Sequence, residues 1–93
     1  MPYEVLWDPR VPEALRTLPE PERKRVVSAI LALADEPAPV SARQLPRPRG
    51  ALRLEAARFS ILYVLDSRAH TVIVYAVLKD GVLLNPGSYR IDA

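Results

Sequence analysis

The stretch RLEAARFSILYVLDSRAHTVIVYAVL, residues Arg53–Leu78, decides how this chain folds. Residues 59–66 alternate between two sets of side chains with the period of two that is typical of a β-strand. Residues 71–78 are β-branched, aromatic or aliphatic, which also favours a strand. The polar segment between them predicts a hairpin. Because a hairpin alone is not stable in water, the rest of the chain must cover it.

The residues before this hairpin predict one strand and two helices. Residues 3–7 alternate as a short strand, and Asp8 followed by Pro9 predicts a helix that begins there and reaches about Leu18. Pro21 opens a second helix, in which apolar residues recur at three- and four-residue spacing as far as about Asp35. The two helices are expected to form a hairpin across one face of the sheet.

The segments on either side of the central hairpin predict a loop, a third long strand and a tight turn. Residues 40–50 are rich in proline and arginine and are expected to form a loop, with residues 51–57 as the next strand. Asp80-Gly81 is a tight-turn signal before a short return strand at residues 82–84. The expected fold class is α+β, with two N-terminal helices packed on a small, mainly antiparallel sheet in the order β-α-α-β-β-β. One domain is expected to span residues 1–93.

The composition excludes several classes of protein. The chain has 93 residues, of which 49% are hydrophobic, enough for one core. With no cysteine and one histidine, neither a disulfide nor a metal site is expected, and no cofactor is predicted. No apolar run approaches the roughly 20 residues of a membrane helix, and the first residues do not resemble a secretory signal. A cytoplasmic protein without membrane partners is the expectation.

The net charge is only +2, but the arginines are unevenly distributed. Five of them, which we call the arginine cluster, lie between residues 42 and 58 with Glu55 as the only acid: Arg43, Arg47, Arg49, Arg53 and Arg58. The planar guanidinium suits phosphate or carboxylate, so the cluster is a candidate surface for nucleic acid. An excess of arginine and proline also follows from the base composition of coding DNA, so an ordinary solvated surface is the alternative.

Four stretches, in this order, resemble the RelE/ParE superfamily, the toxins of bacterial toxin–antitoxin pairs. YEVLWDPRVPEALRTLP is similar to the family's first strand and helix, and PERKRVVSAILALADEP to its second helix. SARQLPRPRGALRLEAARFSILYVLD is similar to its loop, basic strand and following strand, and HTVIVYAVL to its last central strand. The resemblance covers nearly the whole chain and implies the RelE-like fold.

The ribosome-dependent members of this family cut mRNA in the ribosomal A site, using basic residues of the central strands and a tyrosine near the C-terminus. The matching catalytic candidates here are Arg53, Arg58, Lys79 and Tyr89. The candidates for RNA binding are Arg43, Arg47, Arg49 and Arg90. This sequence departs from the family pattern at Ser60, where an arginine is common, and at Asp80, where a basic residue is usual.

The resemblance leaves three functions open. The first is a metal-independent endoribonuclease that acts on ribosome-bound mRNA and is neutralised by a small acidic antitoxin. The second is a ParE-like inhibitor of DNA gyrase that catalyses nothing, and the third is a weakly toxic or inactive member that only binds its antitoxin. Structural roles also compete at single residues: Arg58 as a solvated strand end and Tyr89 as a cap on the core. His70 is expected in an exposed turn.

Overall fold

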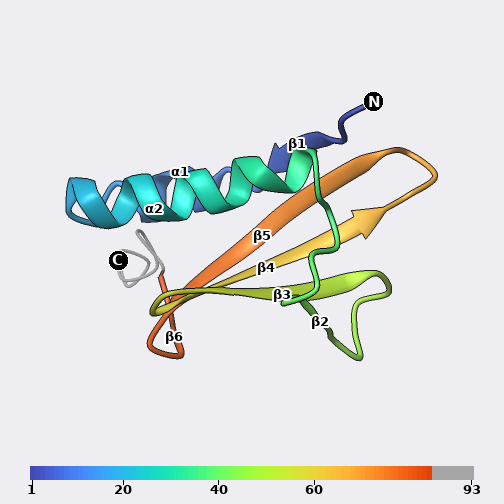
Figure 1. Ribbon diagram of the computed structural model, residues 1–93. Coiled ribbons are helices and arrows are strands. Elements are labelled where there is room, and N and C mark those ends of the chain that lie inside the picture. The colour runs from blue at the N-terminus through green and yellow to red at the C-terminus, as the bar shows by residue number, and fades with distance from the viewer. Residues whose placement is uncertain (85–93) are drawn as a thin grey trace.

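The computed structural model describes residues 1–84. Its helices and strands follow in this order: β1 (Glu4–Trp7), α1 (Arg10–Leu15), α2 (Glu20–Leu31), the short 3-10 helix η1 (Ala32–Ala34), β2 (Arg43–Gln44), β3 (Ala51–Ala56), β4 (Phe59–Asp66), β5 (Thr71–Lys79) and β6 (Val82–Leu83). Figure 1 shows two layers, with both helices on one face of a twisted sheet. The predicted α+β fold class is confirmed.

Within residues 1–84 the strands form one mixed sheet in the order β1-β5-β4-β3-β2, with β6 paired to β5. The central strands β3, β4 and β5 form an antiparallel meander, as the sequence predicts. β1 is parallel to β5, with Val5 opposite Val72 and Trp7 opposite Val74. The chain between β1 and the meander makes this possible, because parallel neighbours need a long connection and the helices supply part of it.

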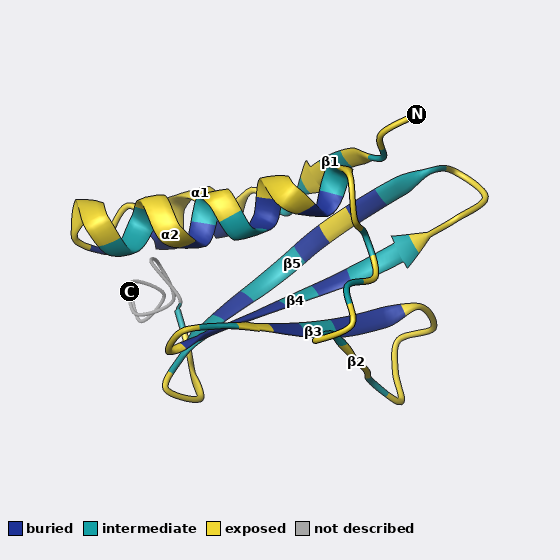
Figure 2. Cartoon of the chain, in the orientation of Figure 1, coloured by how far each residue is buried: buried dark blue, intermediate teal, exposed yellow. Residues whose placement is uncertain are grey.

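The core lies between the helices and the sheet face that they cover. Buried residues of α2 and of β3, β4 and β5, which are dark blue in Figure 2, meet there. Tyr63 at its centre is fully buried, and its hydroxyl donates to the backbone carbonyl of Pro37 at 2.7 Å. Burial raises the pKa of Tyr63 to about 12. The main buried contributors are Val11, Leu15, Val26, Ile30, Leu33, Leu54, Phe59, Ile61, Tyr63, Val72, Val74 and Val77.

A β-bulge decides which way the end of β5 faces. Tyr63 pairs with Val74 but Leu62 pairs with Ala76, so Tyr75 is an extra residue in β5. Because successive strand residues alternate between faces, the extra residue reverses the alternation beyond it. Val77 therefore returns to the helix-covered face with Val74, and Lys79, two residues on, shares that face.

The Asp80-Gly81 turn forms as predicted. Asp80 has φ 52° and Gly81 has φ 82°, the pair of positive angles that suits a two-residue hairpin turn, and Lys79 pairs with Val82 across it. Ala57 also has a positive φ, 59°, in the two-residue turn with Arg58 that joins β3 to β4. Both turns therefore bring their side chains to the same end of the meander.

Three expected boundaries are wrong in detail. α1 ends at Leu15 rather than near Leu18, because the N–H groups of Thr17 and Leu18 bond three residues back instead of four. α2 ends at Leu31, and the chain tightens into η1 before Asp35. The expected loop of residues 40–50 contains β2, a two-residue strand.

No helix within residues 1–84 combines the length and apolar character required to cross a bilayer.

Candidate functional site

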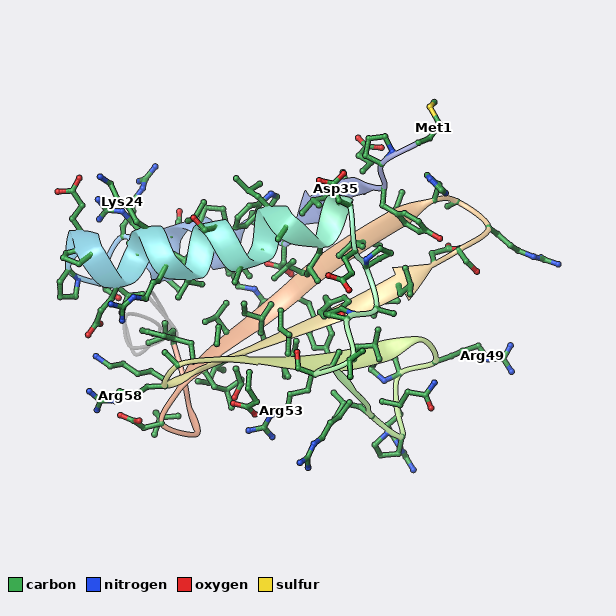
Figure 3. All side chains as sticks on the ribbon, in the orientation of Figure 1. Met1, Lys24, Asp35, Arg49, Arg53 and Arg58 are labelled. Atoms are coloured by element: carbon green, nitrogen blue, oxygen red, sulfur yellow. The ribbon has the colours of Figure 1, made fainter. Side chains whose placement is uncertain are left out.

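The candidate site is on the face of the sheet turned away from the helices, which we call the open face. On β3, Leu52 and Leu54 point into the core, so Arg53 between them points to the open face. Its side chain is 40% exposed. Figure 3 shows Arg53 on the side of the sheet away from the helices, as the sequence predicts.

Arg53 is the centre of a three-residue network with Glu55 and Ser60. Its Nε donates to Glu55 Oε2 at 2.7 Å, and its Nη2 donates to Ser60 Oγ at 3.0 Å. The Ser60 hydroxyl in turn donates to the Glu55 carboxylate, with oxygen separations of 3.1 and 3.2 Å. Ser60 is 3% exposed and faces the same side as Arg53. The network therefore fixes a guanidinium and a carboxylate side by side on the open face.

The rest of the arginine cluster lies around this network. Arg43 on β2 is directly opposite Arg53 in the register, so two arginines share one cross-strand position. Like charges at such a position are unfavourable unless an anion offsets them. Arg47 and Arg49 are exposed in the loop between β2 and β3, with Arg49 at the end of that loop in Figure 3. Arg43, Arg47 and Arg49 thus extend positive charge from the open face into the loop.

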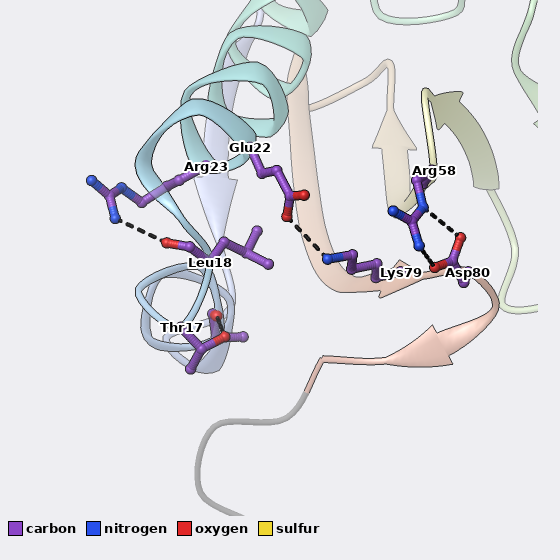
Figure 4. A network of polar contacts seen from close by, with 8 residues as sticks. Thr17, Leu18, Glu22, Arg23, Arg58, Lys79 and Asp80 are labelled. Atoms are coloured by element: carbon purple, nitrogen blue, oxygen red, sulfur yellow. Dashed lines mark hydrogen bonds and ion pairs between the residues drawn. The ribbon is translucent and has the colours of Figure 1, made fainter.

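Arg58 lies at the other end of β3 and is held by Asp80. Its Nε donates to Asp80 Oδ1 at 3.0 Å, and its Nη2 donates to Oδ2 (Figure 4). These hydrogen bonds from Arg58 lower the pKa of Asp80 below its usual value and raise the pKa of Arg58. The pair joins the β3–β4 turn to the β5–β6 turn. Arg58, whose side chain is 64% exposed, is thus a strand-end residue on the surface that pairs with Asp80.

Lys79 faces the helix layer and not the open face. Its Nζ lies 3.1 Å from Glu22 Oε1 on α2, as Figure 4 shows, and 5.8 Å from the centre of the Phe59 ring. Both side chains of this ion pair are 29% exposed. The structure thus separates Lys79 from Arg53 by the thickness of the sheet, so the two do not meet at one site.

The remaining predicted site residues lie apart from the network or outside the described range. Tyr89 and Arg90 lie outside the described residues. His70, in the turn between β4 and β5, stacks on Tyr3 with ring centres 3.8 Å apart. Among residues 1–84 no group of three histidine, aspartate or glutamate side chains lies close enough to hold a metal ion.

Sequence reasoning missed the acidic partners of the basic residues. Asp80 is the ion-pair partner of Arg58, and Glu22, far away in the sequence, is the partner of Lys79. A tight turn at Asp80-Gly81 next to a two-residue turn at Ala57-Arg58 could have indicated the first pair. Nothing in the sequence indicates the second, because it depends on the bulge in β5.

Comparison with known proteins identifies the fold. The RelBE2 toxin–antitoxin complex from Mycobacterium tuberculosis contains a chain with 25% sequence identity and a TM-score of 0.74, covering 87% of this chain and 94% of that one. The RelE–RelB complex from Pyrococcus horikoshii gives 19% identity and a TM-score of 0.73 over 95% of this chain and 99% of that one. The isolated RelE toxin from Escherichia coli gives 16% and 0.70, over 83% of each chain.

No protein-family model and no curated protein sequence matches the chain. The resemblance to the RelE/ParE superfamily is nevertheless confirmed by the structural neighbours, which are RelE toxins free or in complex. The chain therefore has a RelE-like fold.

Proposed function

We propose that this RelE-like chain is the toxin of a type II toxin–antitoxin pair and cleaves mRNA bound in the ribosomal A site. The observation that carries the proposal is the network of Arg53, Glu55 and Ser60 on the open face, with Arg43 directly opposite Arg53. The structural neighbours support the toxin reading, since they are toxins or toxin–antitoxin complexes.

The network supplies two of the three functions that RNA cleavage through the 2′-hydroxyl requires. The hydroxyl must be aligned and deprotonated, the charge on the phosphorane oxygens stabilised and the leaving oxygen protonated. Arg53 and Arg43 can bind a phosphate between them, and the phosphate would offset the repulsion between the two positive charges. Glu55, 51% exposed beside Arg53, is the carboxylate to which this proposal assigns removal of the 2′-hydroxyl proton. In this proposal Tyr89 protonates the leaving oxygen.

The proposed catalytic set is smaller than the sequence indicates. Lys79 faces the helix layer and pairs with Glu22, and Arg58 is bound by both oxygens of Asp80. Ser60 occupies a position on the open face where a further arginine would add positive charge. Arg53, which is paired with Glu55 but lies on the open face, is the charge-stabilising residue that this proposal retains, with Arg43, Arg47, Arg49 and Arg90 as contacts to RNA. A nuclease of this composition is expected to be slow.

A small acidic antitoxin encoded beside this chain is the proposed partner. An arginine-rich surface suits a segment that folds as it binds. We expect a dissociation constant below about 1 μM. Co-purification of the two natural gene products tests this, and two proteins that stay separate at that concentration would contradict it.

A ParE-like inhibitor of DNA gyrase without catalysis is the second candidate. This candidate is supported by the ion pairs that Arg53, Arg58 and Lys79 each form with a carboxylate. Because these basic side chains are already paired within the fold, they are not free to bind a phosphate. A chain that only binds its antitoxin is compatible with the same pairing.

Induction of the chain in a host cell, followed by mapping of mRNA 5′ ends and of DNA breaks, distinguishes these functions. Cuts in translated mRNA spaced by codons support the nuclease. DNA breaks with intact mRNA support the gyrase inhibitor. Growth without either would leave antitoxin binding as the only function.

A further inference from the structure

A cavity, which we call the loop pocket, lies beside the loop between β2 and β3. Its volume is about 450 Å³, within the range of ligand pockets. The chain after η1, the β2–β3 loop and the neighbouring ends of β3 and β4 form its walls. Six of its lining residues carry the argument that follows: Gln44, Leu45, Arg49, Leu52, Leu65 and Ser67.

The strand β2 separates this pocket from the open face. Arg43 pairs with Arg53 and therefore lies on the open face, whereas the next residue, Gln44, pairs with Leu52 on the opposite side of the sheet. Leu52 belongs to the core cluster, so the loop pocket is on the helix-covered side. Because β2 is the last strand in the sheet order, the pocket and the open face meet at the edge of the sheet.

Backbone hydrogen bonds hold the β2–β3 loop in place around the pocket. The N–H of Leu45 donates to the carbonyl of Ala51 at 2.9 Å, and the N–H of Ala51 donates to the carbonyl of Pro48 at 3.0 Å. The N–H of Leu65 donates to the carbonyl of Gly50 at 2.9 Å. Gly50 has φ 81°, and a Cβ there would lie 2.8 Å from the carbonyl oxygen of Leu65, so this position requires glycine. The pocket is thus formed before any ligand binds.

The lining combines an apolar wall with three polar side chains. The apolar wall is formed by three leucines, Leu45, Leu52 and Leu65. The Gln44 amide and the Ser67 hydroxyl each offer both a hydrogen-bond donor and an acceptor. Arg49 adds a planar cation that can stack on a flat ring, and Figure 3 shows it at the end of the loop. The lining, which is drawn from residues 38–67, contains no acid.

These groups suit an unpaired nucleobase, which is a flat ring with a polar edge. Proteins that recognise single-stranded RNA stack such bases on aromatic rings or arginine planes and hydrogen-bond their edges. The charge around the pocket favours the attached phosphates, since Arg47 is exposed in the same loop. Asp66, next to the pocket in the sequence, is engaged in its own turn, where Oδ1 accepts from the N–H groups of Arg68 and Ala69, both at 3.0 Å.

We propose that the loop pocket binds one unpaired base of the RNA whose phosphates cross the open face. The RNA strand passes over β2 from the Arg43–Arg53 position, the base stacks on Arg49, and Gln44 and Ser67 hydrogen-bond its polar edge. The pocket thereby adds recognition of a base to a surface that otherwise contacts phosphates. That RNA is the substrate rests on the proposed function, whereas binding of a base rests on the lining of the pocket.

Titration with two short RNAs tests the binding of a base. Hexauridylate and an abasic hexanucleotide have the same phosphates and differ only in their bases. Binding to the purified full chain is measured by fluorescence anisotropy at low salt, and free RNA stays intact because the proposed cleavage requires the ribosome. We expect hexauridylate to bind about tenfold more tightly, near the low end of what stacking of one base on a protein contributes.

A pair of arginine substitutions separates the pocket from the general charge of the loop. Arg49→Ala and Arg47→Ala each remove one exposed arginine from the same loop, but only Arg49 lines the pocket. Arg47→Ala is expected to weaken both RNAs to the same extent and to keep the tenfold preference, as loss of a phosphate contact does. Arg49→Ala is expected to reduce the preference to about twofold. Gln44→Ala should also reduce it, with the net charge unchanged.

Gln44 provides a direct spectroscopic readout. It is the only glutamine in the chain, so its side-chain NH₂ signals in an NMR spectrum report on the pocket. These signals are expected to shift when hexauridylate is added and to stay in place when the abasic RNA is added. Shifts of the same size with both RNAs would contradict a contact between Gln44 and a base.

The remaining outcomes distinguish this proposal from the proposed function. Equal affinities for the two RNAs, or loss of the preference in Arg47→Ala as well as in Arg49→Ala, overturn the base pocket and leave the proposed function intact. Uridine monophosphate that binds as tightly as hexauridylate makes a free nucleotide the occupant and also overturns the proposal. Absence of binding by either RNA overturns both the pocket and the assignment of the arginine cluster to RNA. The predicted preference in a chain that leaves ribosome-bound mRNA intact supports the pocket and overturns the proposed function.

Discussion

Replacement of Arg53 by alanine is expected to abolish activity while leaving the fold nearly intact. The Arg53–Glu55 ion pair, 2.7 Å long, joins side chains that are 40% and 51% exposed. Exposed pairs of this kind contribute about 0–1 kcal/mol. Ser60 loses a donor but keeps the Glu55 carboxylate as acceptor, so its buried hydroxyl is not left without a partner. The free energy of unfolding should therefore fall by no more than about 1 kcal/mol.

The effect on activity should be much larger. Removal of one preorganised donor to a developing oxyanion typically costs about 3–4 kcal/mol, or 10² to 10³ in rate. Because Arg58 and Lys79 are engaged by Asp80 and Glu22, neither is positioned to replace it. Growth arrest on induction should disappear, and cleavage of ribosome-bound mRNA should fall by at least about 10².

Arg68→Ala is the matched control, because it removes an exposed arginine from the turn between β4 and β5. It should arrest growth like the parent, and urea unfolding should give both variants stabilities within about 1 kcal/mol of the parent. If Arg53→Ala arrests growth as strongly as the parent does, the nuclease mechanism is refuted. If Arg53→Ala unfolds, the inference that this side chain is on the open face without a structural role is refuted instead.

Four further changes test other parts of the structure. Ser60→Arg adds a guanidinium beside Arg53, and we expect the rate of single-turnover cleavage to rise by up to about 10². An unchanged rate in a folded variant would contradict the role of positive charge on the open face. Tyr63→Phe removes the hydrogen bond to Pro37 and should lower the free energy of urea unfolding by about 1 kcal/mol. Because burial raises the folded pKa of Tyr63 to about 12 from an ordinary value of 10, the parent should also lose stability as pH rises from 10 to 12, and the phenylalanine variant should lose less. The hydrogen bond from Arg58 lowers the pKa of Asp80 below its ordinary value of 3.8. The ion pair therefore stabilises the folded chain above pH 3.8, and this stabilisation is lost as the pH falls through the lower folded pKa. Asp80→Asn should remove this loss from the acid unfolding curve. If three to five residues of the arginine cluster meet phosphates, RNA affinity measured against salt should have a log–log slope of about −2 to −3.5, and a flat dependence would mean ordinary solvated surface.

The local elements of the fold could be predicted from the sequence because each depends on neighbouring residues. The β-branched run of residues 71–78 and the alternation of residues 59–66 give β5 and β4, and Asp80-Gly81 gives the turn after them. The parallel pairing of β1 with β5 could not be predicted in the same way. It joins segments more than sixty residues apart, and its partner choice depends on how the helices pack.

The candidate site shows the same division. Arg53 could be placed on the face away from the core because Leu52 and Leu54 flank it. Lys79 could not be placed, because strict alternation from Val74 would put it on the open face and the bulge at Tyr75 reverses that. The short strand β2 could not be predicted from its local sequence either, because it lies in a proline-rich segment. This strand places Arg43 opposite Arg53.

Cleavage of mRNA on programmed ribosomes by the purified chain tests the central claim most directly. The proposed function predicts cuts in the A-site codon that require the ribosome and disappear with Arg53→Ala. Intact mRNA at equimolar chain and ribosome, together with inhibition of purified DNA gyrase by the same preparation, would contradict it.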